Sequence, residues 1–200
     1  MRIFPGNLQR SRLLLITLFG FPIGVTLFAA DWPQWRGPAR DNVWSEPDIR
    51  TQLPSEPLPT RWRAPIGPGF SSPVIAGGQV FVTDSHVAHS SAVERVHCFD
   101  AHSGKALWVH SYKVDYAVWA LDPQNAFGPR STPLVSGHQL FTLGARGHLF
   151  CLDTRDGKVV WQKQLENKSI DSAFTPSPLL DGNRLILVLD GAPPGPCVLA

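Results

Sequence analysis

Two stretches of eleven residues carry most of the structural information in this chain: residues 98–108, CFDAHSGKALW, and residues 151–161, CLDTRDGKVVW. They share five identities, at the cysteine, the aspartate, the glycine, the lysine and the tryptophan. An aspartate and a nearby glycine favour a tight turn, because the carboxylate accepts backbone N–H bonds and glycine adopts positive φ. Each stretch therefore predicts a turn followed by a strand that presents a tryptophan.

The repetition extends on both sides of these turns. A Ser/Thr-Pro pair opens each unit, with a glycine four residues after the proline and an apolar strand residue eight residues after it; the pairs are Ser72-Pro73, Thr132-Pro133 and Ser177-Pro178. This spacing predicts short strands at 72–76, 80–84, 95–99 and 106–112, then at 132–136, 139–143, 148–152 and 159–164, and a third unit that begins at 177–180 and 184–189. Tandem units of four strands predict an all-β protein, a β-propeller of four-stranded antiparallel blades.

One difference separates the first two units. The interval from proline to cysteine is 25 residues in the first and 18 in the second, so the first unit contains seven extra residues. They lie between Asp84 and Val96, where the sequence turns polar. We expect a longer loop between two strands there.

The repeated residues are expected to be structural, because a tryptophan brings a large flat apolar surface to the same place in each unit. Trp62 lies 46 residues before Trp108, so it fits the last strand of a blade whose first three strands do not precede it. In a closed ring such a strand joins the final blade. The predicted structural set is Asp100, Gly104, Trp108, Asp153, Gly157, Trp161 and Trp62.

These segments resemble the tryptophan-docking motif of the PQQ-like (quinoprotein-type) β-propellers, Ala-x-Asp-x-x-Thr-Gly-Lys-x-x-Trp. Cys98 and Cys151 stand in place of its alanine, and Ser103 and Asp156 in place of its threonine. The stretch 31–38, DWPQWRGP, is similar to the start of secreted bacterial PQQ-like repeat proteins. The resemblance covers residues 31–200 and implies the fold, which serves both quinone-dependent dehydrogenases and non-catalytic assembly proteins.

The units divide the chain into five expected parts. They are a signal peptide at 1–30, an N-terminal segment at 31–69 with a ring-closing strand around Trp62, blade 1 at 70–112, blade 2 at 128–165 and a partial blade 3 at 173–200. A propeller needs roughly 4–8 blades to close. We therefore expect an N-terminal fragment of a longer protein, an incomplete arc of about three blades whose exposed edges self-associate.

The charge distribution separates an export signal from the body of the protein. The chain has 18 basic and 16 acidic residues, but Arg2, Arg10 and Arg12 precede an apolar run at 13–28, which is followed by the small residues Ala29 and Ala30. This order predicts a cleavable signal peptide, a periplasmic or extracellular location and no membrane span after its removal; a retained anchor is the alternative. The remaining body has a net charge of −1 and no cluster of lysine and arginine, which argues against nucleic acid as a partner.

Few residues suggest chemistry. Cys98 and Cys151 occupy equivalent positions and are expected to be small packing residues with free thiols. His86, His89 and His97 have a spacing that resembles metal ligands, but a polar loop explains them better, and we expect no metal. The chain contains neither a nucleophile elbow nor a glycine-rich phosphate loop, so hydrolase and nucleotide-dependent chemistry have no support.

The starts of the inner strands are expected to line the central channel. The predicted channel-lining residues are Phe70, Ser71, Arg130, Ser131 and Thr175, and Arg130 is the candidate to bind an anionic group, with a surface salt bridge as the plainer alternative. We expect an exported, non-catalytic binding or protein-assembly scaffold, similar in fold to the outer-membrane protein assembly lipoprotein, with exported or envelope proteins as partners and no cofactor. The alternative is a PQQ-dependent alcohol or sugar dehydrogenase with calcium. The adjacent cysteine pair of that family is absent from this chain.

Overall fold

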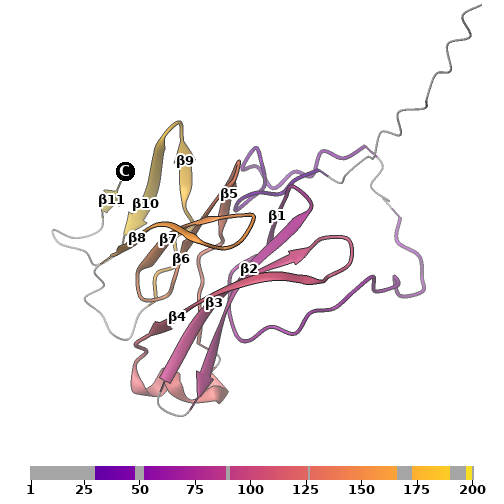
Figure 1. The fold of residues 1–200 in the computed structure, drawn as a ribbon. Coiled ribbons are helices and arrows are strands. Elements are labelled where there is room, and N and C mark those ends of the chain that lie inside the picture. The colour runs from indigo at the N-terminus through magenta and orange to yellow at the C-terminus, as the bar shows by residue number, and fades with distance from the viewer. Residues whose placement is uncertain are drawn as a thin grey trace, which may run out of the picture.

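A computed structural model of the chain describes residues 30–47, 52–88, 91–125, 127–165, 173–189 and 197–199. The predicted signal peptide lies outside these residues except for its last position. The described residues form antiparallel sheets in the order β1-β2-β3-β4, β5-β6-β7-β8 and β11-β10-β9 (Figure 1). We call them blades 1, 2 and 3, and they confirm the prediction of an all-β propeller in an open arc.

The strand bounds follow the repeat closely. Blade 1 contains β1 Val74–Ala76, β2 Gln79–Ala88, β3 Ser91–Asp100 and β4 Ala106–Val114; blade 2 contains β5 Leu134–Ser136, β6 Gln139–Leu143, β7 His148–Asp153 and β8 Val159–Gln164; blade 3 contains β9 Leu179–Asp181, β10 Arg184–Leu189 and β11 Cys197–Leu199. Gly77, Gly137 and Gly182 have φ of 57°, 57° and 59° in the first hairpin of each blade. The glycine after each Ser/Thr-Pro pair is thus explained by the same left-handed turn.

Blade 1 has a long hairpin where the sequence predicts a loop. Strands β2 and β3 stay paired through Ala88 and Ser91, so the expected loop between Asp84 and Val96 is wrong. The extra residues remain strands because Ala92 and Val114 pack with the linker that follows β4, in a cluster with Tyr116, Ala120 and Phe127. These apolar partners lie more than twenty residues further along the chain, so the polar composition of the extension by itself wrongly predicts a loop.

The linker between blades 1 and 2 contains two short 3₁₀ helices, η1 Val118–Leu121 and η2 Pro123–Asn125. They lie beside the end of the long hairpin (Figure 1). In the part of the chain that the structure describes, no helix has the length and hydropathy needed to cross a membrane.

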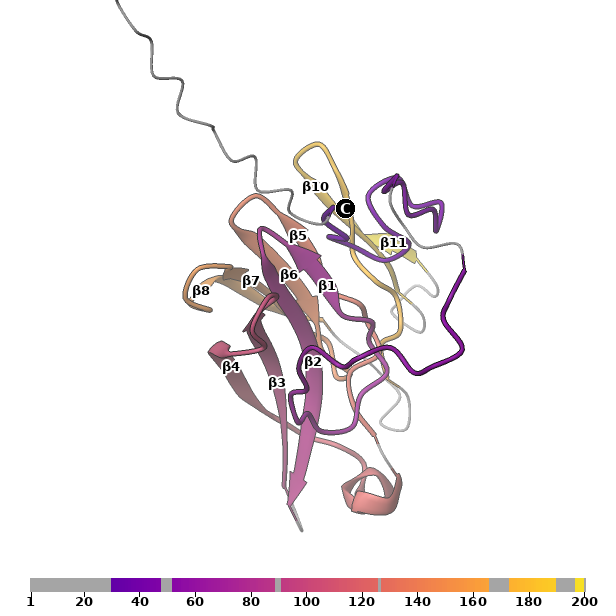
Figure 2. The same cartoon turned by 90° about the vertical axis from the view of Figure 1, so that its right-hand side faces the viewer.

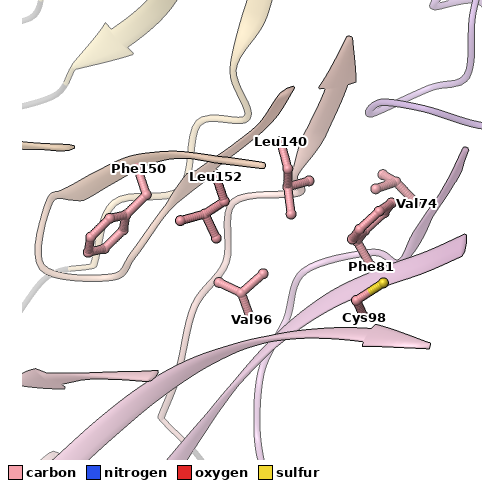
Figure 3. Close-up of a cluster of buried hydrophobic side chains, with 7 residues drawn as sticks. All are labelled: Val74, Phe81, Val96, Cys98, Leu140, Phe150 and Leu152. Carbon is pink, nitrogen blue, oxygen red and sulfur yellow. The ribbon is translucent and has the colours of Figure 1, made fainter. Parts of the chain in front are cut away.

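The main core lies between blades 1 and 2. Side chains from the two sheets point toward one another across this interface (Figure 3); they are Val74, Phe81, Val96 and Cys98 of blade 1 and Leu140, Phe150 and Leu152 of blade 2. All are at most 4% exposed. Cys98 and its equivalent Cys151 are free and buried, and burial raises the pKa of the Cys98 thiol to about 12. Both therefore fit a packing role rather than a reactive one.

Trp62 and Trp108 each lie on the Asp-to-Gly turn of the following unit. The indole N–H of Trp62 donates to the carbonyl of Ala101 at 3.0 Å, and that of Trp108 donates to Thr154 at 2.9 Å. A Cβ at Gly104 would lie 2.5 Å from the Trp62 ring, and one at Gly157 would lie 2.5 Å from the Trp108 ring. Both positions therefore require glycine for two reasons: the backbone has a positive φ, and the indole ring leaves no room for a Cβ.

The segment around Trp62 is extended but belongs to no strand among the described residues. Its indole nevertheless occupies, on blade 1, the place that Trp108 occupies on blade 2. A ring-closing role for this segment stays a prediction.

Candidate functional site

The Ser/Thr-Pro pairs form a hydrogen-bonded series across the starts of the inner strands. The backbone N–H of Ser72 donates to Thr132 Oγ1 at 3.2 Å, and the backbone N–H of Thr132 donates to Ser177 Oγ at 3.0 Å. Each hydroxyl thus accepts a hydrogen bond from a backbone N–H of the preceding blade. The repeat needs serine or threonine here because a short side-chain oxygen replaces a backbone partner between strands that splay apart.

The predicted channel-lining residues are partly brought together at this end. The Arg130 guanidinium lies 5.1 Å from the centre of the Phe70 ring and 5.7 Å from that of Phe127. The backbone N–H of Phe70 donates to the carbonyl of Pro129 at 2.8 Å, which fixes the two segments side by side. We call Phe70, Phe127 and Arg130 the channel mouth. Sequence reasoning missed Phe127, which no repeat position marks.

The mouth presents an oriented cation. Phe70 is 59% exposed and Arg130 is also exposed, so the guanidinium remains open to solvent while two rings limit its motion. A planar fork of N–H donors held in this way suits a carboxylate. Thr175 is exposed as well, and Ser71 and Ser131 lie deeper.

The space beside the mouth is small. A cavity of about 150 Å³ is lined by Pro68, Ser85, His86, Asp122 and Phe127, among others. Pockets that enclose a small-molecule ligand are usually about 300–1,000 Å³. This cavity therefore has room for a side chain of a partner rather than for a whole cofactor.

Ser71 and Ser131 occupy equivalent positions but differ in their partners. Thr83 Oγ1 donates to Ser71 Oγ at 2.8 Å, whereas Ser131 Oγ is buried without a hydrogen-bond partner among the described residues. The reason lies in the repeat, since the place of Thr83 is taken in blade 2 by Leu143.

This difference predicts opposite effects of the same substitution. We expect Ser71→Ala to lower the free energy of unfolding by about 1 kcal/mol, because it leaves Thr83 without its partner. Ser131→Ala is expected to be neutral or stabilising, because it removes a buried hydroxyl that makes no bond. Urea unfolding of both variants measures the two effects. Equal losses for the two variants would contradict the assignment.

Asp84 holds the N-terminal segment to blade 1. Its buried carboxylate accepts from the backbone N–H of Gly67 at 2.5 Å, from Arg95 at 2.8 and 2.5 Å, and lies 3.0 Å from His97 Nε2. Burial alone would raise the pKa of Asp84, but the hydrogen bonds from His97, Arg95 and Gly67 together lower it to about 2. The carboxylate is therefore ionised and fully engaged near neutral pH.

The depressed pKa of Asp84 makes stability depend on acid pH. Because the folded-state pKa lies below the unfolded value of 3.8, this contribution is present above 3.8 and is lost as the pH falls through about 2. We expect Asp84→Asn to be less stable than the wild type near neutral pH, with a difference that shrinks between these two values. Chemical denaturation at a series of pH values measures it. A difference that stays constant over this range would disprove the role of Asp84.

Glu94 joins blade 1 to blade 2. Its side chain is fully buried and accepts from Tyr112 at 2.5 Å, from Tyr116 at 2.7 Å and from the backbone N–H of Ala145 at 3.0 Å. Burial raises its pKa above the ordinary value, and the three hydrogen bonds offset only part of that rise. Gly144 passes so close that a Cβ there would lie 2.4 Å from the Tyr112 hydroxyl.

The described residues do not fit a calcium–quinone site. The two buried carboxylates, Asp84 and Glu94, already have their oxygens occupied by protein donors. Within the described ranges, no group of three or more His, Cys, Asp or Glu side chains is placed to hold a metal. His97 contacts Asp84, His86 lies exposed on β2, and His89 lies outside the described residues.

Comparison with known proteins extends the resemblance. Residues 94–192 match the family described as "Outer membrane protein assembly factor BamB". The chain is 30% identical over 123 residues to the outer membrane protein assembly factor BamB of Vibrio cholerae, a match that covers 61% of this chain and 28% of that protein. The chain therefore spans little more than a quarter of that relative.

Solved structures resemble the chain more distantly. A europium-containing methanol dehydrogenase has 16% identity and a TM-score of 0.45 over 62% of this chain and 21% of that chain. BamB from Moraxella catarrhalis has 21% identity and a TM-score of 0.35 over 70% of this chain and 46% of that chain. In its repeats, its four-stranded blades and the family match over residues 94–192, the chain is similar to PQQ-like β-propeller repeat proteins.

Proposed function

We propose that the protein is an exported, non-catalytic binding scaffold that takes part in the assembly of outer-membrane proteins. The observation that carries this proposal is the sequence match to the assembly factor family over residues 94–192. This range includes most of β3, all of β4 to β10 and the linker at the channel mouth.

The geometry of the mouth supports binding rather than catalysis. An exposed guanidinium between two aromatic rings, beside a cavity of about 150 Å³, suits an acidic side chain or a terminal carboxylate of a protein partner. The proposed partners are exported or envelope proteins. The proposed location is the periplasm or the cell exterior, reached through the signal peptide that the first thirty residues predict.

Deletion of the gene in the source organism tests the assembly role. We expect lower amounts of folded outer-membrane β-barrel proteins in the cell envelope, measured by heat-modifiable migration, and recovery when the complete gene is restored. An Arg130→Ala gene should restore them less well than an Arg63→Ala gene, which removes a surface arginine outside the mouth. Unchanged outer-membrane proteins in the deletion strain would contradict the assembly role.

A second assay tests the absence of catalysis. The complete protein, incubated with PQQ and calcium, is expected to show no dye-linked oxidation of alcohols or sugars. Dye reduction that requires both additions would overturn the non-catalytic proposal and favour a quinoprotein dehydrogenase.

A further inference from the structure

The segment 31–44, which precedes the blades, crosses the inner strands. At blade 1, the Asp31 carboxylate accepts from the backbone N–H of Gly77 at 3.1 Å. Trp32 and Ile75 then exchange two backbone hydrogen bonds, of 2.8 and 3.0 Å. The segment therefore begins with one antiparallel bridge to the free edge of β1.

The same segment continues to the other two blades. The backbone N–H of Val135 in β5 donates to the carbonyl of Pro33 at 2.8 Å, and Arg40 Nη2 donates to the carbonyl of Leu180 in β9 at 2.9 Å. Because β1, β5 and β9 are the first strands of their blades, these contacts cross the channel side of the arc. Figure 2 shows this segment in indigo beside the ends of the inner strands.

The segment has a fixed shape of its own. Trp32 lies between Gly37 and Trp44; the two indole rings stack with centres 5.3 Å apart, and a Cβ at Gly37 would lie 2.7 Å from the Trp32 ring. Arg36, Arg40 and Asn42 have φ of 68°, 62° and 63°. Side-chain-bearing residues rarely adopt this region, so the contacts with Trp32 and the blades must hold the backbone there.

The segment covers one end of the inner strands and leaves the other free. Beneath it, a cavity of about 450 Å³ is lined by Asp31 and Pro33 on one side and by Gly77, Gln79 and His138 on the other. Gly77 and His138 lie in the first turns of blades 1 and 2, and Gln79 is the first residue of β2. The channel mouth with Arg130 lies at the opposite end, before β5 begins.

We propose that residues 31–44 are a strap that closes the channel at the turn end, so that a partner segment reaches the inner strands only from the Arg130 end. This inference goes beyond the proposed function, because it holds for whichever partner binds. The strap also ties blade 3 to blade 1, in addition to its contact with blade 2.

Thiol labelling of the complete protein tests the closure. Gln79 and Gln139 occupy the same repeat position, but only Gln79 lines the cavity beneath the strap. Gln79→Cys and Gln139→Cys are compared in a background with Cys197→Ser, while Cys98 and Cys151 stay buried. With a polyethylene-glycol maleimide, we expect the thiol at position 79 to react roughly tenfold more slowly, since the strap must open first.

Loosening the strap should remove that difference. In Trp32→Ala, position 79 should react as fast as position 139, and the amides of Ile75 and Val135 should exchange with deuterium faster. Arg36→Ala changes an exposed side chain that makes no hydrogen bond or ion pair with the other described residues, so it should leave both rates unchanged. Equal labelling at positions 79 and 139 in the intact protein would overturn the proposal. So would unchanged amide exchange in a folded Trp32→Ala protein.

Discussion

Glu94→Ala is expected to lower the free energy of unfolding by about 3–5 kcal/mol. The loss arises because Tyr112, Tyr116 and the backbone N–H of Ala145 all donate to this one carboxylate in a buried interface. Alanine leaves all three donors without an acceptor and opens a cavity between blades 1 and 2. Urea unfolding followed by tryptophan fluorescence measures the change.

Glu94→Gln is the matched control and adds a pH dependence. Glutamine keeps one acceptor oxygen and does not titrate, so Glu94→Gln should lower the free energy of unfolding by less than Glu94→Ala does. Because the folded-state pKa of Glu94 is raised, its contribution is fully present below the ordinary glutamate pKa and is lost as the pH rises through the raised value. The stability of the wild type relative to Glu94→Gln should therefore fall with rising pH. A rise over the same range would contradict the assignment of a raised pKa.

Trp108→Ala is expected to cost about 3–5 kcal/mol, a value typical of tryptophan lost from an interface core. The substitution removes the ring that lies on Gly157 and touches Phe81, with ring centres 5.9 Å apart, and it frees the carbonyl of Thr154. Thermal unfolding measured by circular dichroism should show a large fall in the midpoint temperature.

Trp108→Phe separates stacking from hydrogen bonding, because phenylalanine keeps a ring but cannot donate to Thr154. It should recover most of the loss, with about 1 kcal/mol remaining for the absent bond. Gly157→Ala should also destabilise, and by more than Gly137→Ala, since both glycines have positive φ but a Cβ at Gly137 meets no atom within 4 Å. Equal costs for the two glycines would show that the indole contact contributes nothing.

The sequence predicted the strands well wherever the information was local or repeated. Strands β6, β8 and β10 have the bounds that the repeat predicts, and the turn at Gly157 has the expected conformation. These features depend on turn residues and on apolar alternation within a few positions, which the chain carries in each unit. Phe70 and Arg130 do lie against each other, but that they line a channel stays a prediction.

The features that escaped prediction depend on contacts between distant segments. The hydrogen bonds of the strap join residues that lie about forty to one hundred and forty positions apart in the chain, and no periodicity marks them. No pattern in the sequence marks Glu94 as a buried acceptor, and only the folded chain shows that two tyrosines and a backbone amide donate hydrogen bonds to it. Phe127 and the hairpin extension were missed for the same reason.

Contacts between successive units in this arc run in one direction. Ser72 donates to a hydroxyl of blade 2, the indole of Trp108 lies on the turn of blade 2, and Glu94 receives its last donor from Ala145. As the chain leaves the ribosome from its N-terminus, blade 1 therefore lacks these partners until blade 2 has also emerged. Folding during synthesis should lag by one repeat, and a chain that pauses between the two blades would expose the interface that Phe81 and Val96 later bury.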